Sequence, residues 1–344
     1  MSKVFNWKLL IFGLLILVLA ACGEKSQEDV VKKLSENLEE MSSYKAQAEM
    51  SMNTGQEEQK FNIDIWHKKK DFYRVALSNN IDDKGSQIIL KNKDGVFVLT
   101  PALKKSFKFQ SEWPQNSSQP YLYQSLVNDV LKDSEAAFEA NDSHYIFRTK
   151  TNYQSNNNLP SQEIYFDKKT LTPVTVKVLD KDNNVLVEVN FASFELDSKF
   201  AEDDFTIDKN LAASAASATA SGEEAESESD SKQVLSVMLP EYTAGAELAE
   251  QKNVELENGN RVILTFTGER SFTLIEEHAE VLPTLTEPQE VQGEVINLGY
   301  TVAALTDKTL EWTHDGVDYI LASDELTKDE MIRVAESVQG KITK

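Results

Sequence analysis

The chain has 344 residues, of which 40% are hydrophobic and 27% charged. This apolar content can build a core for one large or two smaller domains, so wholesale disorder is excluded. The 57 acidic residues outnumber the 35 basic ones and give a formal charge of −22, which argues against non-specific nucleic-acid binding because such binding needs a cationic face. The single cysteine, Cys22, excludes an intramolecular disulfide and any cysteine-rich metal site.

The first 21 residues have the composition of a secretory signal. They contain no acid, begin with Lys3 and Lys8, and continue with an apolar run over residues 9–20. The run has about the length of a signal-peptide core and is shorter than the ~20 residues of a membrane-spanning helix. It ends in a motif that resembles the lipobox of bacterial lipoproteins, formed by Leu19, Ala20, Ala21, Cys22 and Gly23.

The lipobox resemblance implies removal of residues 1–21 and a diacylglycerol on the Cys22 sulfur. A generic secretory signal is the alternative interpretation. Loss of the two signal-segment lysines would change the formal charge from −22 to −24. Because two acyl chains satisfy the two-signal requirement for stable anchoring, we expect the protein to be tethered to the outer face of the cytoplasmic membrane.

The chain up to residue 208 has the pattern of a helix followed by many strands. Ser26 is suited to cap a helix, and apolar residues recur after it at helical spacing. A second helix is expected from Tyr121 to Leu131. Asp94-Gly95 predicts a tight hairpin. Strands follow strands through short turns, which predicts a mostly antiparallel sheet. The expected strands include residues 44–52, 61–65, 73–77, 88–90, 96–99, 145–147, 164–166, 174–176 and 185–191.

Composition changes sharply near residue 212. From there to residue 232 the chain has no aromatic residue and no apolar one larger than alanine, so it cannot bury enough surface to order itself. We interpret residues 209–232 as an acidic linker, although the alanine-rich half is also compatible with a short helix. Residues 233–344 then predict a small α+β domain. Its signals are hairpin turns at Asn258-Gly259 and Asp315-Gly316, and a final helix that begins at Thr327 and is ended by Gly340.

No catalytic or metal-binding motif stands out. The four histidines lack metal-ligand spacing, and no nucleophile elbow or phosphate-binding glycine loop is present. Asp180, Asp182 and Asn184 match the first ligands of a calcium loop, but Val185 stands where that loop needs glycine. We interpret this segment as a hairpin turn. The sequence therefore predicts a protein that is not an enzyme and holds no metal or cofactor.

Residues 26–208 resemble the outer-membrane lipoprotein carrier (LolA-like) superfamily. The resemblance is carried by a tryptophan, basic and aromatic run over residues 66–73, by the hairpin over residues 93–101, and by the expected helix from Tyr121 to Val130, where the family has a lid. Residues 233–344 are similar to a C-terminal domain of unknown function. It occurs in lipid-anchored members from spore-forming Gram-positive bacteria that are tied to sporulation or germination.

This resemblance implies an α+β fold in which residues 22–208 form a curved antiparallel half-barrel with helices in its concave face, and the C-terminal domain ends in a helix. It also implies an apolar cavity inside the half-barrel. Lys69 stands where soluble carriers have a lid-closing arginine, so it is the candidate for closing the lid or contacting a lipid head group. The candidates for lining the cavity or its lid are Trp66, Phe72, Phe97, Leu122, Leu126 and Val130.

Three functional hypotheses follow. The first is an anchored, extracytoplasmic lipoprotein that binds a lipid, acyl chain or lipoprotein in support of envelope or spore development. A diacylated protein stays at the membrane, which favours holding or presenting a ligand over shuttling it. The second is a non-catalytic interaction or sensor lipoprotein without a lipid ligand, with an envelope protein partner on the C-terminal domain. The third is a transporter solute-binding lipoprotein, although the strand–helix alternation of that class is missing.

Overall fold

The computed structural model describes residues 25–53, 58–69, 71–79, 86–110, 118–153, 159–212, 235–256, 259–281 and 287–341. The predicted signal segment, the lipobox with Cys22, and linker residues 213–232 lie outside the described residues, and their interpretation stays a prediction. Within the described part of the chain, no helix has the length and apolarity needed to cross a membrane.

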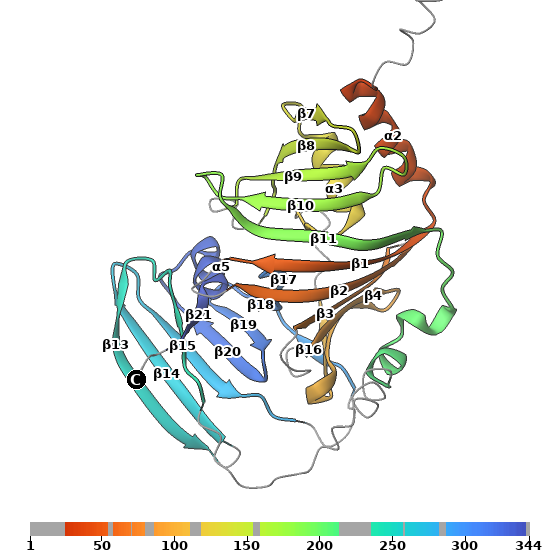
Figure 1. Ribbon diagram of the computed structural model, residues 1–344. Helices are drawn as coiled ribbons and strands as arrows, with labels where there is room; N and C mark the ends of the chain where they lie inside the picture. Colours follow the sequence, from red (N-terminus) through yellow and green to blue (C-terminus); the bar gives the residue numbers. More distant parts are fainter. Residues whose placement is uncertain are drawn as a thin grey trace, which may run out of the picture.

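Two helices pack on one face of the first sheet. The predicted cap of α2 (Gln27–Glu40) is confirmed: the Ser26 side chain accepts a hydrogen bond from the Asp29 backbone, and the Asp29 carboxylate accepts one from the Ser26 backbone. α3 (Tyr123–Lys132) forms where the second helix was expected and contacts α2. In Figure 1, α3 lies behind the strands of the upper half of the molecule and α2 stands at their upper right end.

The first sheet is long, open and almost wholly antiparallel. Its order is β16-β6-β5-β4-β3-β2-β1-β11-β10-β9-β8-β7, so β16 and β7 are its edges and the half-barrel prediction is confirmed. Eleven of its strands are β1 (Ser43–Met52), β2 (Gln59–Lys68), β3 (Phe72–Asn79), β4 (Gln87–Asn92), β5 (Gly95–Thr100), β6 (Lys105–Phe109), β7 (Ala137–Ala140), β8 (His144–Lys150), β9 (Ser161–Asp167), β10 (Pro173–Leu179) and β11 (Val185–Leu196). Asp94-Gly95 makes the predicted hairpin between β4 and β5.

The twelfth strand, β16 (Gln289–Val291), comes from the C-terminal part of the chain. It pairs parallel to β6, whereas the other pairings in the sheet are antiparallel. The predicted domain boundaries therefore do not coincide with the division between the sheets, because a piece of the second region completes the sheet of the first.

A strap formed by residues 200–212 covers the outer face of the first sheet, opposite the helices. It contains the short helix η3 (Glu202–Phe205) and helical residues 207–212. Its Phe205 carbonyl accepts a hydrogen bond from the Asn92 side chain at 2.9 Å, and its Asn210 accepts one from Arg74 at 2.5 Å. The outer-face core consists of Ile88, Leu90, Phe97, Leu99, Phe205 and Leu211.

The second sheet has seven antiparallel strands in the order β13-β14-β15-β20-β19-β18-β17. The predicted turn at Asp315-Gly316 is confirmed, since His314 pairs with Val317. Asn258 of the other predicted turn lies outside the described residues, and the strands on either side of it pair Leu256 with Gly259. The strands are β13 (Ala246–Leu256), β14 (Gly259–Gly268), β15 (Phe272–His278), β17 (Glu294–Asn297), β18 (Val302–Leu305), β19 (Thr309–His314) and β20 (Val317–Ala322).

The final helix, α5 (Lys328–Glu336), begins at the predicted capping box of Thr327 and Glu330. The prediction that Gly340 ends it is wrong. The helix ends at Glu336, and Ser337 caps it with a backbone N–H that bonds to the Val334 carbonyl. The following residues form β21 (Val338–Lys341), which pairs with β12 (Met238–Pro240). Val338 is buried, so strand pairing and core packing draw the chain out of the helix before the glycine is reached.

Candidate functional site

The half-barrel and the second sheet meet in a junction, one side of which, here called the closed side, is held by buried polar contacts beside a smaller pocket of about 220 Å³. Gln87 on β4 is 4% exposed. Its amide donates to the Thr313 carbonyl at 2.8 Å and accepts from the Thr301 hydroxyl at 2.9 Å. Beside it, the Lys105 ammonium lies 3.2 Å from the Asp318 carboxylate. In each contact one partner lies on the half-barrel sheet and the other lies on the second sheet or, for Thr301, directly before its strand β18. These bonds therefore fix the two parts against each other.

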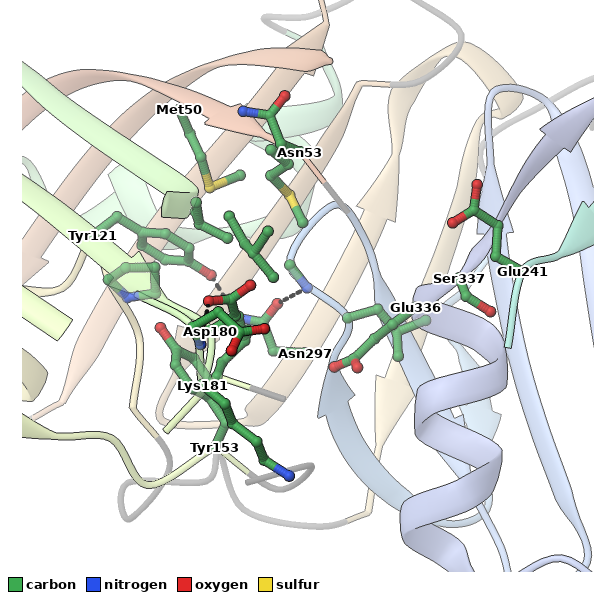
Figure 2. A pocket seen from close by; sticks show the side chains of 18 residues that line it. Met50, Asn53, Tyr121, Tyr153, Asp180, Lys181, Glu241, Asn297, Glu336 and Ser337 are labelled. Carbon is green, nitrogen blue, oxygen red and sulfur yellow. Dashed lines mark hydrogen bonds between the residues drawn. The ribbon is translucent and has the colours of Figure 1, made fainter. Parts of the chain in front are cut away.

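The other side of the junction is hollow. A cavity of about 480 Å³ lies between the ends of β1, β10 and β11 and the region of β17 and α5 (Figure 2). Its wall is mainly apolar, with two tyrosine rings. The apolar and aromatic lining residues are Met50, Met52, Pro120, Tyr121, Tyr153, Leu159, Leu186, Val187 and Leu298.

One tight contact shapes the cavity floor. Gly299 has φ +87°, a left-handed conformation that strains residues with a side chain, and a Cβ added to it would lie 2.7 Å from the methyl carbon at the flexible end of Met52. Next to it, the Asn297 amide donates to the Tyr121 hydroxyl at 2.9 Å and its carbonyl oxygen accepts from the Gly299 N–H at 2.8 Å. Burial raises the pKa of Tyr121 well above its usual value, so the hydroxyl stays protonated.

The mouth of the cavity is acidic. Asp180 and Asp182 come from the β10–β11 turn, Glu241 follows β12, and Glu336 ends α5, whereas Lys181 is the one basic residue among those that line the cavity. Hydrogen bonds from the Asn184 side chain and backbone and from the Asp182 backbone lower the pKa of Asp180. The predicted hairpin turn is thereby confirmed, with Asp180 as its acceptor.

The six predicted lining residues do not come together, and none of them lines this cavity. Leu122, Leu126 and Val130, at the start of α3 and along it, are at most 4% exposed and belong to the main core. Trp66, Phe72 and Phe97 lie on the outer face, packed with the strap. Successive side chains of a strand point to opposite faces of the sheet. On β5, Val96 and Val98 therefore face the main core, whereas Phe97 faces the strap.

The interior of the half-barrel is filled by aromatic packing around α3. Tyr44 stacks on Phe194 with ring centroids 4.8 Å apart and meets Tyr123 edge-on at 6.3 Å. Gln124 of α3 lies 2.8 Å from the His67 ring nitrogen. Burial lowers the pKa of His67 to about 4, so the ring is neutral at pH 7. In this packed interior α3 is a core helix that contacts α2 and β8.

Lys69, the predicted lid or head-group residue, is exposed at the turn after β2. Its ammonium donates to the Glu39 carbonyl at 3.0 Å, and its backbone N–H donates to the Ser42 carbonyl at 2.7 Å. These bonds join it to the end of α2. A role toward a ligand stays a prediction.

The residues of the junction cavity were missed because they come from separate segments with no common spacing. One part of the lining could be seen in the sequence, because Asp180 and Asp182 belong to the turn that partly matches a calcium loop. In the described part of the chain, no group of three or more histidine, cysteine, aspartate or glutamate residues is arranged to hold a metal ion.

Comparison with known proteins gives the family. The model of YdcC-like sporulation proteins matches residues 3–205. The sporulation protein YdcC of Bacillus subtilis (strain 168) is 48% identical over 340 residues, covering 98% of each chain. Similarities to solved structures are weaker. They include the Pseudomonas aeruginosa MucA/MucB complex, at 14% identity over 92% of this chain and 99% of that one with a TM-score of 0.36. A LolA superfamily protein from Nitrosomonas europaea is 10% identical over 54% and 100% of the two chains, with a TM-score of 0.30. The chain belongs to the YdcC-like family of sporulation proteins.

Proposed function

We propose that the protein is a non-catalytic, extracytoplasmic lipoprotein, tethered through Cys22, that binds the apolar part of a lipid, acyl chain or lipoprotein in support of sporulation. The observation that carries the proposal is the apolar junction cavity of about 480 Å³. The interior of the half-barrel is packed, so the junction is where an apolar group can be accommodated.

The chemistry of the cavity suits an alkyl chain. Transfer of apolar surface from water is favourable without directional contacts, and ligand sites are commonly apolar concavities between domains with a few polar groups. Met50 and Met52 line the wall, and flexible thioether side chains adapt to ligands of varied shape. The Asn297–Tyr121 bond and the closed side of the junction hold the wall in place, so the cavity is largely formed before a ligand enters.

The anchor gives this binding a location. The acidic protein surface is repelled by an anionic membrane, so contact with the membrane is made by the diacylglyceryl group proposed on Cys22. A tethered protein with an apolar cavity holds or presents a ligand at the membrane surface, whereas a shuttle has to leave it.

The test uses residues 22–344 with Cys22→Ser, so that the protein's own acyl chains do not compete. Titration with a fluorescent dodecyl-chain probe should show saturable binding, and Leu186→Trp, which places an indole in the cavity, should weaken it about tenfold, since filling a pocket removes the volume for the chain. The matched control is Leu196→Trp on the same strand, where the leucine is 43% exposed and outside the cavity. Absence of saturable binding, or equal effects of the two variants, would refute the proposal and favour the interaction-only alternative.

A further inference from the structure

We infer that the ligand of the junction cavity carries a positive charge next to its apolar chain. This rests on the proposed function and adds to it the chemical class of the ligand: an amphiphile with an ammonium or other cationic group, as in a lipid with an aminoacylated head group or in a basic lipopeptide.

The distribution of charge around the mouth is the first observation. Four carboxylates, on Asp180, Asp182, Glu241 and Glu336, line the cavity with a single ammonium, that of Lys181. They come from both parts of the molecule, two from the β10–β11 turn and two from the segments beside β12 and α5. In Figure 2, Glu336 extends from α5 toward the half-barrel and the Asp180 turn, while the Lys181 ammonium extends away from the wall at Met50.

The second observation concerns what these carboxylates already bind. Asp180 is committed to its own turn, where three N–H groups at 2.8 to 2.9 Å keep it charged. The side chains of Asp182 and Glu241, by contrast, make no hydrogen bond or ion pair to another residue of the described ranges. Both are exposed at the mouth. They are therefore available to a ligand.

An apolar cavity with an acidic mouth should favour amphiphiles whose head group is positively charged. An alkyl chain that enters the cavity brings its head group to the mouth, because the chain is the part that gains from leaving water. An anionic head group would there face a lining with four carboxylates and one ammonium, and like-charge juxtaposition disfavours a partner. A cationic head group would meet complementary charge. The overall charge of −22 also attracts a cationic ligand from a distance and repels an anionic one.

The experiment compares three amphiphiles with the same dodecyl chain, each below its micelle concentration: dodecyltrimethylammonium, dodecyl maltoside and dodecyl sulfate. They are titrated calorimetrically into residues 22–344 carrying Cys22→Ser, with circular dichroism as the check on folding. We expect the cationic compound to bind about tenfold more tightly than the anionic one at low ionic strength, and the ratio to shrink as salt screens the charges.

Paired variants localise the effect. Asp182→Asn with Glu241→Gln should remove most of the preference for the cation while leaving binding of dodecyl maltoside unchanged. Glu247→Gln with Glu250→Gln on the exposed strand β13 changes the net charge by the same amount away from the mouth, and should keep the preference. Equal binding of all three amphiphiles, or equal effects of the two double variants, would overturn the inference and leave the proposed function intact. Failure of all three to bind would remove the proposed function itself.

Two further probes distinguish natural sources of the same chemistry. Vesicles containing lysyl-phosphatidylglycerol represent the lipid, and a diacylated, lysine-rich lipopeptide represents the peptide. Binding of either one that is weakened by Asp182→Asn with Glu241→Gln supports the inference and names its source. The inference would be contradicted if vesicles of phosphatidylglycerol, which is anionic, bound as tightly as both cationic probes.

Discussion

The half-barrel interior and the junction beside it differ in how they are filled. In the interior, α3 buries Tyr123, Leu126, Val127 and Val130 against the sheet, and the aromatic rings around Tyr44 occupy the remaining space. In the junction, residues of both sheets leave about 480 Å³ open. In this molecule an apolar ligand could be held in two places, the concave face of the first sheet and the junction with the second sheet. In this molecule the first is occupied by its own helix, and the second is hollow.

The largest expected effect tests whether the interior is full. Leu126 is 0% exposed, and Leu126→Ala should lower the free energy of unfolding by about 3 kcal/mol because it leaves a void in a close-packed core. Urea unfolding followed by circular dichroism measures this. Leu131→Ala on the same helix is the control, since Leu131 is 39% exposed and its loss should cost no more than about 0.5 kcal/mol. A cost near 0.5 kcal/mol for Leu126→Ala would mean that the interior is hollow too.

The next effect concerns the closed side of the junction. Gln87→Leu removes two hydrogen bonds between the sheets, whereas Thr301 and Thr313 stay bonded to each other, and the loss of two buried hydrogen bonds should cost about 2 kcal/mol. Dodecyl-probe binding should weaken at the same time, because the two sheets are no longer held in register around the cavity. Gln251→Leu on exposed β13 is the control and should change neither quantity. Unchanged probe binding in Gln87→Leu would show that the cavity does not depend on the closed side.

A third effect depends on pH. Burial raises the pKa of Glu276 to about 8, opposed by its hydrogen bond from the Met238 backbone. The folded state keeps this proton above pH 4.5 while the unfolded state releases it, so stability should fall as pH rises from about 4.5 to 8, by at most about 1.4 kcal/mol per unit. Glu276→Gln should flatten this dependence and be the more stable protein at pH 8. Thermal unfolding across that range measures it, and parallel profiles for the two proteins would be inconsistent with a protonated Glu276.

This titration bears on the junction because Glu276 holds β12. The Met238 backbone N–H lies 3.0 and 3.2 Å from the two carboxylate oxygens, β12 pairs with β21, and Glu241 and Ser337 beside these strands line the cavity. At alkaline pH the buried charge should destabilise this wall of the cavity, although the ionised carboxylate accepts the Met238 N–H more strongly than the protonated one.

The smallest effect completes the comparison. Leu186 lines the cavity and is only partly buried, so Leu186→Ala should lower the free energy of unfolding by less than about 1 kcal/mol, since few atoms lose contacts. The same urea titration measures it beside Leu126→Ala. If the two substitutions lowered the free energy of unfolding equally, the interior and the junction would not differ in how tightly they are packed.

Features set by local chemistry were predictable from the sequence. Ser26 and Thr327 cap helices as expected, and the hairpins at Asp94-Gly95 and Asp315-Gly316 form where their turn residues lie. Each of these depends on a few neighbouring residues. The family resemblance added the curved, open sheet, which no single motif specifies.

Features that depend on distant segments were not predictable in the same way. Alternation shows which residues share a face but not which face the helices cover, so Trp66 and Phe72 were placed with Leu126 although they lie on opposite faces. A signal was available: residues 88–90 are continuously apolar, as a strand covered on both faces should be. The junction cavity had no such signal, because its lining is assembled by tertiary packing alone.

The pairing of β16 with β6 has a consequence for how the protein is made. Without β16, the strand β6, which carries Phe107 and Phe109, would be an edge of the sheet. Residues 289–291, which cover it, are synthesised long after it. Until they arrive, the half-barrel presents unpaired backbone groups to any neighbouring strand, a known route to aggregation. We therefore expect residues 289–291 to protect the edge of the first sheet, and a chain truncated before residue 289 to aggregate more readily than the full chain even though every other strand of that sheet is present.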